Sequence, residues 1–147
     1  MTTEFLNDLP KRFRSYQITA ITSLLFAIIG FSYNAWRMAE SEQNNTIRTA
    51  SFEILIQLSA LEQVVFAAYY DKDLKTGSPR LGWIAVGLIS DLSQLTDLQV
   101  QTSADELKQQ WQQQWPKIHE DQSAVEAVQQ SADYVRKQIH LTLRSLN

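Results

Sequence analysis

An uncharged stretch at residues 15–36 (SYQITAITSLLFAIIGFSYNAW) constrains this chain more than any other feature. Arg14 directly precedes it and Arg37 directly follows it. As an α-helix rising about 1.5 Å per residue, it would reach ~33 Å, enough to cross a hydrocarbon layer of about 30 Å. Tyr16 and Trp36 place amphipathic rings at its two ends, where lipid headgroups would lie. The stretch therefore predicts one transmembrane helix embedded in membrane lipid.

Three other interpretations of this stretch fit less well. A core helix of a globular protein rarely lacks charge over about 18 residues or more. A cleaved signal peptide needs small residues at positions −3 and −1 of its cleavage site, but a cut after Ala35 puts Tyr33 at −3. A helix lying in the interface would carry a strongly charged face, which this stretch lacks. We expect an uncleaved span.

The flanking charges predict the orientation of the span. Lys11, Arg12 and Arg14 cluster before it, whereas Arg37 is the single basic residue close behind it. Basic residues favour retention of a short flank in the cytoplasm. We therefore expect a cytoplasmic tail at residues 1–14 and a C-terminal part in the periplasm or outside the cell, with a bacterial inner membrane as the expected location.

One side of the predicted span carries small or polar residues. They recur at spacings of three and four and are Ala20, Ser23, Ala27, Gly30 and Asn34. Because lipid gives helices no hydrophobic reason to associate, small residues that allow close backbone approach supply the contact instead. This stripe predicts a helix-packing seam for another protein's span or for a homo-oligomer. The alternative is that small residues are simply common in transmembrane helices.

The composition of the remaining chain excludes several classes of protein. Residues 37–147 carry 14 acidic and 10 basic residues, a formal net charge of −4, which argues against a nucleic-acid partner. There is no cysteine, so neither disulfides nor thiol chemistry are available. The whole chain has only four glycines and three prolines, too few for a β-protein with many tight turns. The chain is long enough for one compact extramembrane domain.

Apolar residues recur with a helical period in three further segments. In the first, residues 46–72, the stripe is Ile47, Ser51, Ile54, Leu58, Leu61, Val65 and Ala68, widened by Phe52, Leu55, Ile56 and Phe66. In the second, residues 79–97, it is Leu81, Ile84, Leu88, Leu92 and Leu95, with Val86 and Ile89 beside them. In the last it is Val125, Val128, Ala132, Val135, Ile139, Thr142 and Leu146. Each stripe predicts an amphipathic helix with its apolar side in a core.

Local motifs predict where these helices begin and end. Gly77 is expected to end the first helix and Pro79 to open the next one. The motifs SADE at residues 103–106 and SAVE at residues 123–126 are capping boxes, each predicting a helix start. Pro116 predicts a break near the preceding tryptophan. Short connections between such helices favour up-and-down packing.

The predicted fold is therefore all-α, a single N-terminal transmembrane helix followed by an antiparallel three- to four-helix bundle. Its parts are a basic tail at residues 1–14, the span at 15–36, a stalk at 37–46 and the bundle at 47–147. Gly82 and Gly87 are costly inside a helix, by about 1 kcal/mol each relative to alanine. We expect helices to approach closely there, with a ligand-lined gap as the alternative.

No motif in the chain predicts a chemical activity. Asp71 could start a calcium loop, but its sixth and twelfth positions would be Thr76 and Gly82, where an EF-hand needs glycine and glutamate. His119 and His140 are the only histidines, and a zinc site wants three or four ligands brought together. Phosphate-binding glycine loops and nucleophile motifs are absent from the sequence. We expect neither enzyme activity nor a cofactor or metal.

Trp111 and Trp115 lie four residues apart, on one side of a predicted helix. Tryptophan is common both in cores and at binding hot spots, so this pair is a candidate partner-binding surface if it is exposed. We expect a non-enzymatic, membrane-anchored helical scaffold, an accessory subunit binding protein partners through its span and its bundle. The alternative is a sensory or small-ligand-binding ectodomain, whose short tail at residues 1–14 would need a separate signalling partner.

Overall fold

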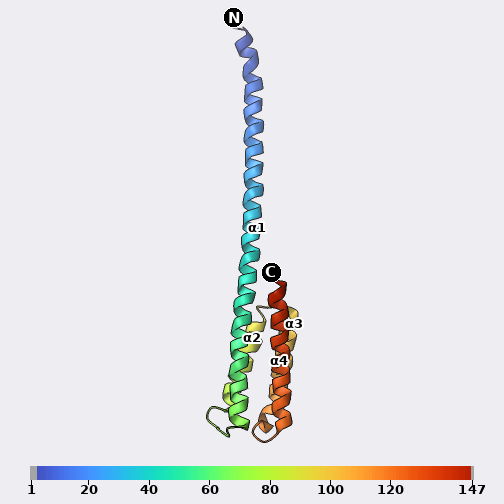
Figure 1. Cartoon of the computed structure of the whole chain (residues 1–147). Helices are drawn as coiled ribbons and strands as arrows, with labels where there is room; N and C mark the ends of the chain where they lie inside the picture. Colours follow the sequence, from blue (N-terminus) through green and yellow to red (C-terminus); the bar gives the residue numbers. More distant parts are fainter. Residues whose placement is uncertain (1–2, 147) are drawn as a thin grey trace. The chain divides into compact units, whose positions relative to one another are not determined.

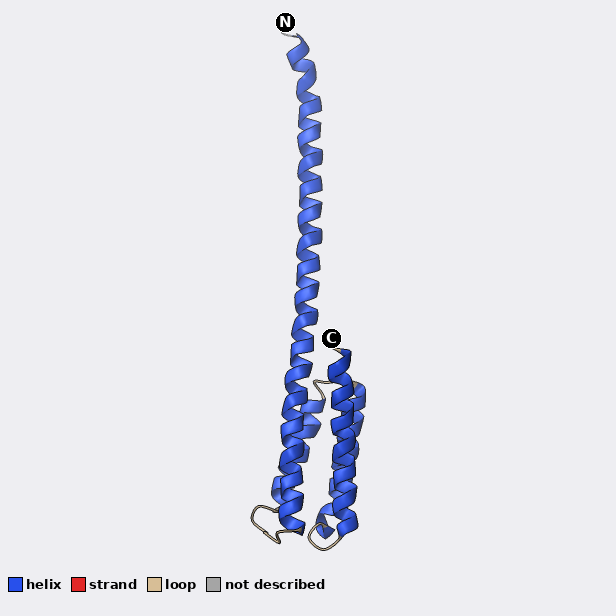
Figure 2. Ribbon diagram, in the orientation of Figure 1, coloured by secondary structure: helices blue, strands red, loops and turns tan. Residues whose placement is uncertain are grey.

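The computed structural model describes the backbone of residues 3–146 and the side chains of residues 16–146. Over these residues the fold is helical and contains no strand, which confirms the predicted all-α class (Figures 1 and 2). The elements are α1 (Thr3–Tyr69), α2 (Pro79–Ser93), α3 (Leu98–Gln114), the short 3₁₀ helix η1 (Trp115–Lys117) and α4 (Gln122–Ser145).

The chain forms two compact units that divide after Gln43. The boundary falls within the polar segment at residues 37–46. In the first unit every side chain from Tyr16 to Gln43 is exposed, although residues 16–36 are uncharged. In the part of the chain with described side chains, α1 is the one helix long and apolar enough to cross a membrane.

The second unit has one hydrophobic core, to which all four helices contribute. The stripe predicted for residues 46–72 supplies the α1 part of this core, with Ile47 only partly covered and the others buried. The stripe predicted for the last helix supplies the α4 part, with Leu146 partly covered. α3 packs against both α2 and α4. The periodicity of the two longest segments therefore identifies their buried sides correctly.

Polar contacts join α4 to the part of α1 that belongs to the second unit. The Arg136 guanidinium pairs with the Glu62 carboxylate at 2.8 Å and also contacts Asp133. The Arg48 guanidinium donates to the backbone carbonyl of Leu146 at 3.2 Å. These contacts hold α4 against the part of α1 between Arg48 and Glu62.

Both predicted capping boxes are wrong, because aspartates upstream begin the helices instead. Asp97 caps α3 by accepting from the Val100 amide at 3.0 Å. Ser103 therefore lies buried inside α3, where its hydroxyl donates to the Val100 carbonyl at 2.9 Å. Asp121 caps α4 by accepting from the Ser123 amide at 2.9 Å and from the Ser123 hydroxyl at 2.7 Å. Aspartate caps a helix as well as serine does, so the sequence offers two competent caps at each start.

The connection between α1 and α2 differs from the prediction in its details. α1 ends at Tyr69, and the left-handed residue that follows is Lys72 (φ 53°) rather than Gly77. Gly77 is needed for close contact, since a Cβ built on it would lie 2.4 Å from the Ala68 backbone nitrogen. Pro79 opens α2 as predicted.

The other ends of the helices follow from the same competition between local signals. α2 ends at Ser93, earlier than the predicted Asp97, because Asp97 is the cap of α3. α3 ends at Gln114, and Pro116 lies in η1, so the predicted break near Trp115 is confirmed.

The stripe predicted to be the buried side of α2 is wrong, although Val86 and Ile89, expected beside it, are buried. Its buried residues are mostly small and are Gly82, Ala85, Val86, Ile89, Ser90 and Ser93. The predicted stripe instead faces solvent, with only Leu92 partly covered. A helix with two charged residues, Arg80 and Asp91, has two apolar sides, and hydrophobicity alone cannot choose between them.

Gly82 shows why the side with small residues packs inward. A Cβ built on Gly82 would lie 2.0 Å from Cζ2 of Trp111, so the indole ring of α3 lies directly against the α2 backbone. The expected close approach is therefore present at Gly82. A Cβ on Gly87 meets no described atom within 4 Å, so no close approach occurs there. The ring occupies the space at Gly82 where a ligand-lined gap was the alternative.

Candidate interaction surfaces

The small-residue stripe of the first unit lies along α1. Ala20, Ser23, Ala27, Gly30 and Asn34 are all exposed. A Cβ built on Gly30 would meet no described atom within 4 Å. Within the described chain this side of the helix is therefore uncovered.

The two tryptophans predicted as a possible surface occupy different environments. Trp111 is 1% exposed and belongs to the core, where its indole nitrogen has no hydrogen-bond partner among the described residues. Trp115 lies in η1 and is 36% exposed. Burial of Trp111 leaves Trp115 as the accessible member of the pair.

Titratable side chains form no cluster suited to a metal ion within residues 16–146. No group there brings together three or more histidine, aspartate, glutamate or cysteine side chains for that purpose. His119 and Glu120 approach each other at 3.2 Å on the surface. The shifted pKa values belong to structural contacts. The Ser123 hydroxyl lowers the pKa of Asp121, the Thr76 hydroxyl lowers that of Asp73, and the hydrogen bond to Glu62 raises that of Arg136.

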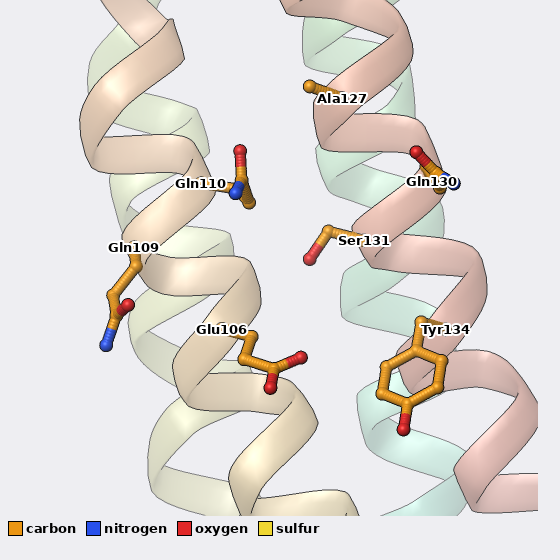
Figure 3. A pocket seen from close by; sticks show the side chains of 7 residues that line it. All are labelled: Glu106, Gln109, Gln110, Ala127, Gln130, Ser131 and Tyr134. Atoms are coloured by element: carbon orange, nitrogen blue, oxygen red, sulfur yellow. The ribbon is translucent and has the colours of Figure 1, made fainter.

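A polar groove of about 360 Å³ lies between α3 and α4. Its lining residues are Glu106, Gln109, Gln110, Ala127, Gln130, Ser131 and Tyr134. In Figure 3 the Glu106 carboxylate points from α3 toward α4, and the Ser131 hydroxyl points back toward α3. Most of these side chains are exposed, and none is buried. The groove offers hydrogen bonds to a polar ligand without removing that ligand from water.

A second depression, of about 490 Å³, lies along α4 and is mainly basic. Its lining residues are Asp133, Arg136, Lys137, His140, Leu141 and Arg144. Arg136 is already engaged by Glu62 and Asp133. Lys137 and Arg144 are exposed and supply the remaining fixed positive charge.

The solvent side of α2 is apolar. We call Leu81, Ile84 and Leu88 the α2 outer face, because their spacing puts them on one side of the helix; Leu95 is exposed in the turn that follows it. These side chains are 41–54% exposed. Exposed apolar patches of a few hundred Å² usually mark a contact with a protein or a membrane. The small residues on the opposite side of α2 were the sequence signal that could have revealed this face.

The solvent side of α1 in the second unit is also partly apolar. We call Phe52, Ile56, Ser59, Gln63, Phe66 and Tyr70 the α1 outer seam. The prediction that Phe52, Ile56 and Phe66 widen the core-facing stripe is wrong, since these side chains and Tyr70 are 41–62% exposed. A depression of about 600 Å³ follows the seam and is lined by Phe52, Leu55, Ile56, Ser59, Ala60 and Gln63.

No family model, no curated protein and no solved structure matches this chain.

Proposed function

We propose that this protein is a single-pass membrane protein whose second unit is an antiparallel helical bundle that binds protein partners, as a non-enzymatic accessory or scaffold subunit. The observation that carries the proposal is the α2 outer face. Leucine and isoleucine side chains are exposed there, on the side of the helix opposite a well-packed core.

Two observations support the membrane anchor. Residues 16–36 lack charge and leave their apolar side chains uncovered, which is unfavourable in water by roughly 25 cal/mol for each Å² exposed. The basic cluster at Lys11, Arg12 and Arg14 supports a cytoplasmic tail and a second unit on the other side of the membrane. A cleaved signal sequence is the competing explanation, and retention of the N-terminus in the mature protein distinguishes the two.

The contacts between α1 and α4 support the antiparallel bundle. Arg48 contacts Leu146, whereas Glu62, further along α1, contacts Arg136, further back along α4. Pairing of rising with falling residue numbers is the pattern of antiparallel helices. A bundle of this kind fixes the outer sides of its helices rigidly, which suits a docking scaffold.

The polar groups support a binding role more than a catalytic one. Within residues 16–146 the carboxylates and histidines are dispersed, and the α3–α4 groove exposes its single carboxylate, Glu106, to water. Catalytic groups usually have their pKa values shifted by burial or by a neighbouring charge in a cleft. Here the two lowered aspartate pKa values arise from capping and turn hydrogen bonds at Asp73 and Asp121.

The α3–α4 groove favours one second candidate function, a sensor or small-ligand-binding ectodomain. Its amide, hydroxyl and carboxylate groups match a small polar ligand that both donates and accepts hydrogen bonds. Such a sensor would act through a separate signalling partner.

Affinity purification from gently solubilised membranes tests the proposed function. We expect partner proteins to co-purify in fixed stoichiometry and to be lost in an Ile84→Glu, Leu88→Glu double variant. Leu141→Glu is the control, because Leu141 is as exposed as these residues but lies on α4. Equal recovery of the partners by the double variant and the control would reject the α2 outer face as the docking site, provided that circular dichroism shows both to be folded.

A further inference from the structure

We propose that the α1 outer seam binds the same seam of a second copy, forming a parallel two-stranded coiled coil. The inference goes beyond partner binding through α2, and its parallel direction rests on the membrane anchor proposed above.

The spacing of the seam is that of a coiled coil. From Phe52 to Tyr70 its members follow one another at alternating steps of four and three, the a and d positions of a heptad. The core of the second unit uses the opposite side of α1, where Ile54, Leu58 and Leu61 are fully buried. The seam is therefore free to bind without opening the fold.

The residues that line the depression along α1 are suited to surround a side chain from the facing helix of a second copy. Four of its lining residues occupy a and d positions of the seam, and these are Phe52, Ile56, Ser59 and Gln63. The other two, Leu55 and Ala60, border the seam on either flank. In a coiled coil each a or d side chain inserts among four residues of the facing helix. Small residues at Ser59 and Ala60 leave room for such an insertion between the bulkier ends of the seam.

The charges beside the seam favour a second copy in parallel. Arg48 directly precedes an a position, Thr49, and Glu53 directly follows a d position, Phe52. These g and e positions, five residues apart, face each other across a parallel pair of helices and form its interhelical salt bridges. A parallel dimer would thus gain the contact from Arg48 to Glu53 of the second copy twice.

Both residues already make contacts within one copy. Arg48 donates to the Leu146 carbonyl and makes a further contact. Glu53 accepts from the Gln57 amide at 3.1 Å, and a carboxylate has about four acceptor sites. An antiparallel pair centred on the seam would place neither residue opposite a partner of opposite sign.

The size of the seam explains why the membrane matters. The large side chains of the seam are about half exposed, and they are Phe52, Ile56, Phe66 and Tyr70. Since a large aromatic side chain has about 150–250 Å² to bury, these four would cover on the order of 400 Å² per copy. Two copies would then bury roughly 800 Å², the size of a weak contact between soluble proteins. Anchoring both copies in one membrane raises their effective concentration and gives them the same direction away from the bilayer.

Cysteine cross-linking in native membranes tests the proposal, because the chain has no cysteine of its own. We expect Ser59→Cys and Thr49→Cys each to give a disulfide-linked homodimer under mild oxidation. The control is Lys108→Cys, an exposed position on α3, which should give at least tenfold less dimer. Antiparallel pairing centred on the seam would separate the two Thr49 positions by about 36 Å. A dimer with Ser59→Cys but not with Thr49→Cys would therefore overturn the parallel arrangement.

Charge reversal tests the same pairing independently. In the Ser59→Cys background we expect Ile56→Glu to reduce the amount of disulfide-linked dimer at least tenfold. Leu88→Glu, on α2, should leave that amount unchanged. Glu53→Arg should weaken the dimer, and adding Arg48→Glu should restore it. An unaffected dimer in the Ile56→Glu variant, or loss of the dimer with Leu88→Glu instead, would overturn the seam as the interface.

Alkaline carbonate extraction of the same membranes separates failure of this proposal from failure of the proposed function. If the protein stays in the membrane and partners still co-purify, but neither cysteine variant cross-links, only the dimer is rejected. If the protein is released into the supernatant, the membrane anchor itself is rejected.

Discussion

Gly82 shows how one hydrogen atom in place of a methyl group sets the distance between two helices. Its position against the Trp111 ring leaves no room for a Cβ, since the built atom would lie 2.0 Å from Cζ2. We expect Gly82→Ala to destabilise the second unit by about 1–3 kcal/mol, because α2 or the ring must move in a packed core. Urea unfolding of the detergent-solubilised chain, followed by circular dichroism, measures this loss.

Gly87 supplies the matched control on the same helix. A Cβ there meets no described atom within 4 Å, so only the helix propensity of alanine changes. We expect Gly87→Ala to be neutral or to stabilise by up to about 1 kcal/mol. Equal effects of the two substitutions would contradict the close approach at Gly82.

Asp121 links the start of α4 to pH. The Ser123 hydroxyl and amide lower its pKa below the ordinary value of 3.8. Because the folded-state pKa lies below the unfolded one, the contact stabilises the fold above pH 3.8 and is lost as the pH falls through the folded-state value. We expect Asp121→Asn to be less stable than the wild type at pH 7, with the difference shrinking at pH 3. Thermal unfolding at both pH values measures it.

Asp105→Asn is the control for this effect. Asp105 is exposed within α3 and caps no helix, so its substitution should leave the unfolding temperature almost unchanged at both pH values. A difference between Asp121→Asn and the wild type that stayed constant from pH 7 to pH 3 would show that the cap does not depend on its charge.

At the scale of elements, periodicity succeeded where a helix has a single apolar side. α4 is such a helix, and its predicted seam from Val125 to Thr142 is buried as expected. α2 has apolar residues on both sides, and packing against Trp111 selects the side that carries Gly82. Both stripes can be read from the sequence, but the position of the Trp111 ring, which determines which stripe is buried, cannot.

The candidate surfaces were less predictable than the helices for the same reason. Phe52 and Ile56 resemble core residues in the sequence, and only the position of the neighbouring helices shows that their side of α1 is exposed. Trp111 and Trp115 share a predicted side, but the end of α3 at Gln114 gives them different environments. Exposure depends on contacts between elements, which a pattern along one element cannot contain.

The stripe on the predicted span leads to a prediction about assembly. We expect replacement of Ala27 and Gly30 together by leucine to reduce oligomerisation or partner retention, because added bulk prevents close approach of another helix. Thr22→Leu with Ser32→Leu adds similar bulk away from the stripe and serves as the control. Size-exclusion chromatography in mild detergent measures both. Unchanged assembly in the first double variant would count against the seam.

At the scale of the molecule, the proposed function depends on which side of the membrane holds each end of the chain. The chain places Lys11, Arg12 and Arg14 before the uncharged stretch and Arg37 behind it. The same stretch, near an N-terminus, would also suit a signal sequence by length and composition. The two possibilities differ in one product, the mature N-terminus.

We expect an N-terminal epitope tag to remain on the mature protein and to resist carbonate extraction with it, because a bulky Tyr33 at −3 disfavours cleavage after Ala35. Alkaline phosphatase, which is active only outside the cytoplasm, should be active when fused after Asn147. Replacing the three basic residues by glutamine and adding three lysines after Arg37 should lower that activity, since basic flanks stay in the cytoplasm. Loss of the tag would indicate a cleaved leader, and an inactive fusion in the unaltered chain would reverse the orientation. Loss of the tag would also remove the basis for placing α1 seams from two copies in parallel, whereas a reversed orientation would still anchor both copies in the same direction.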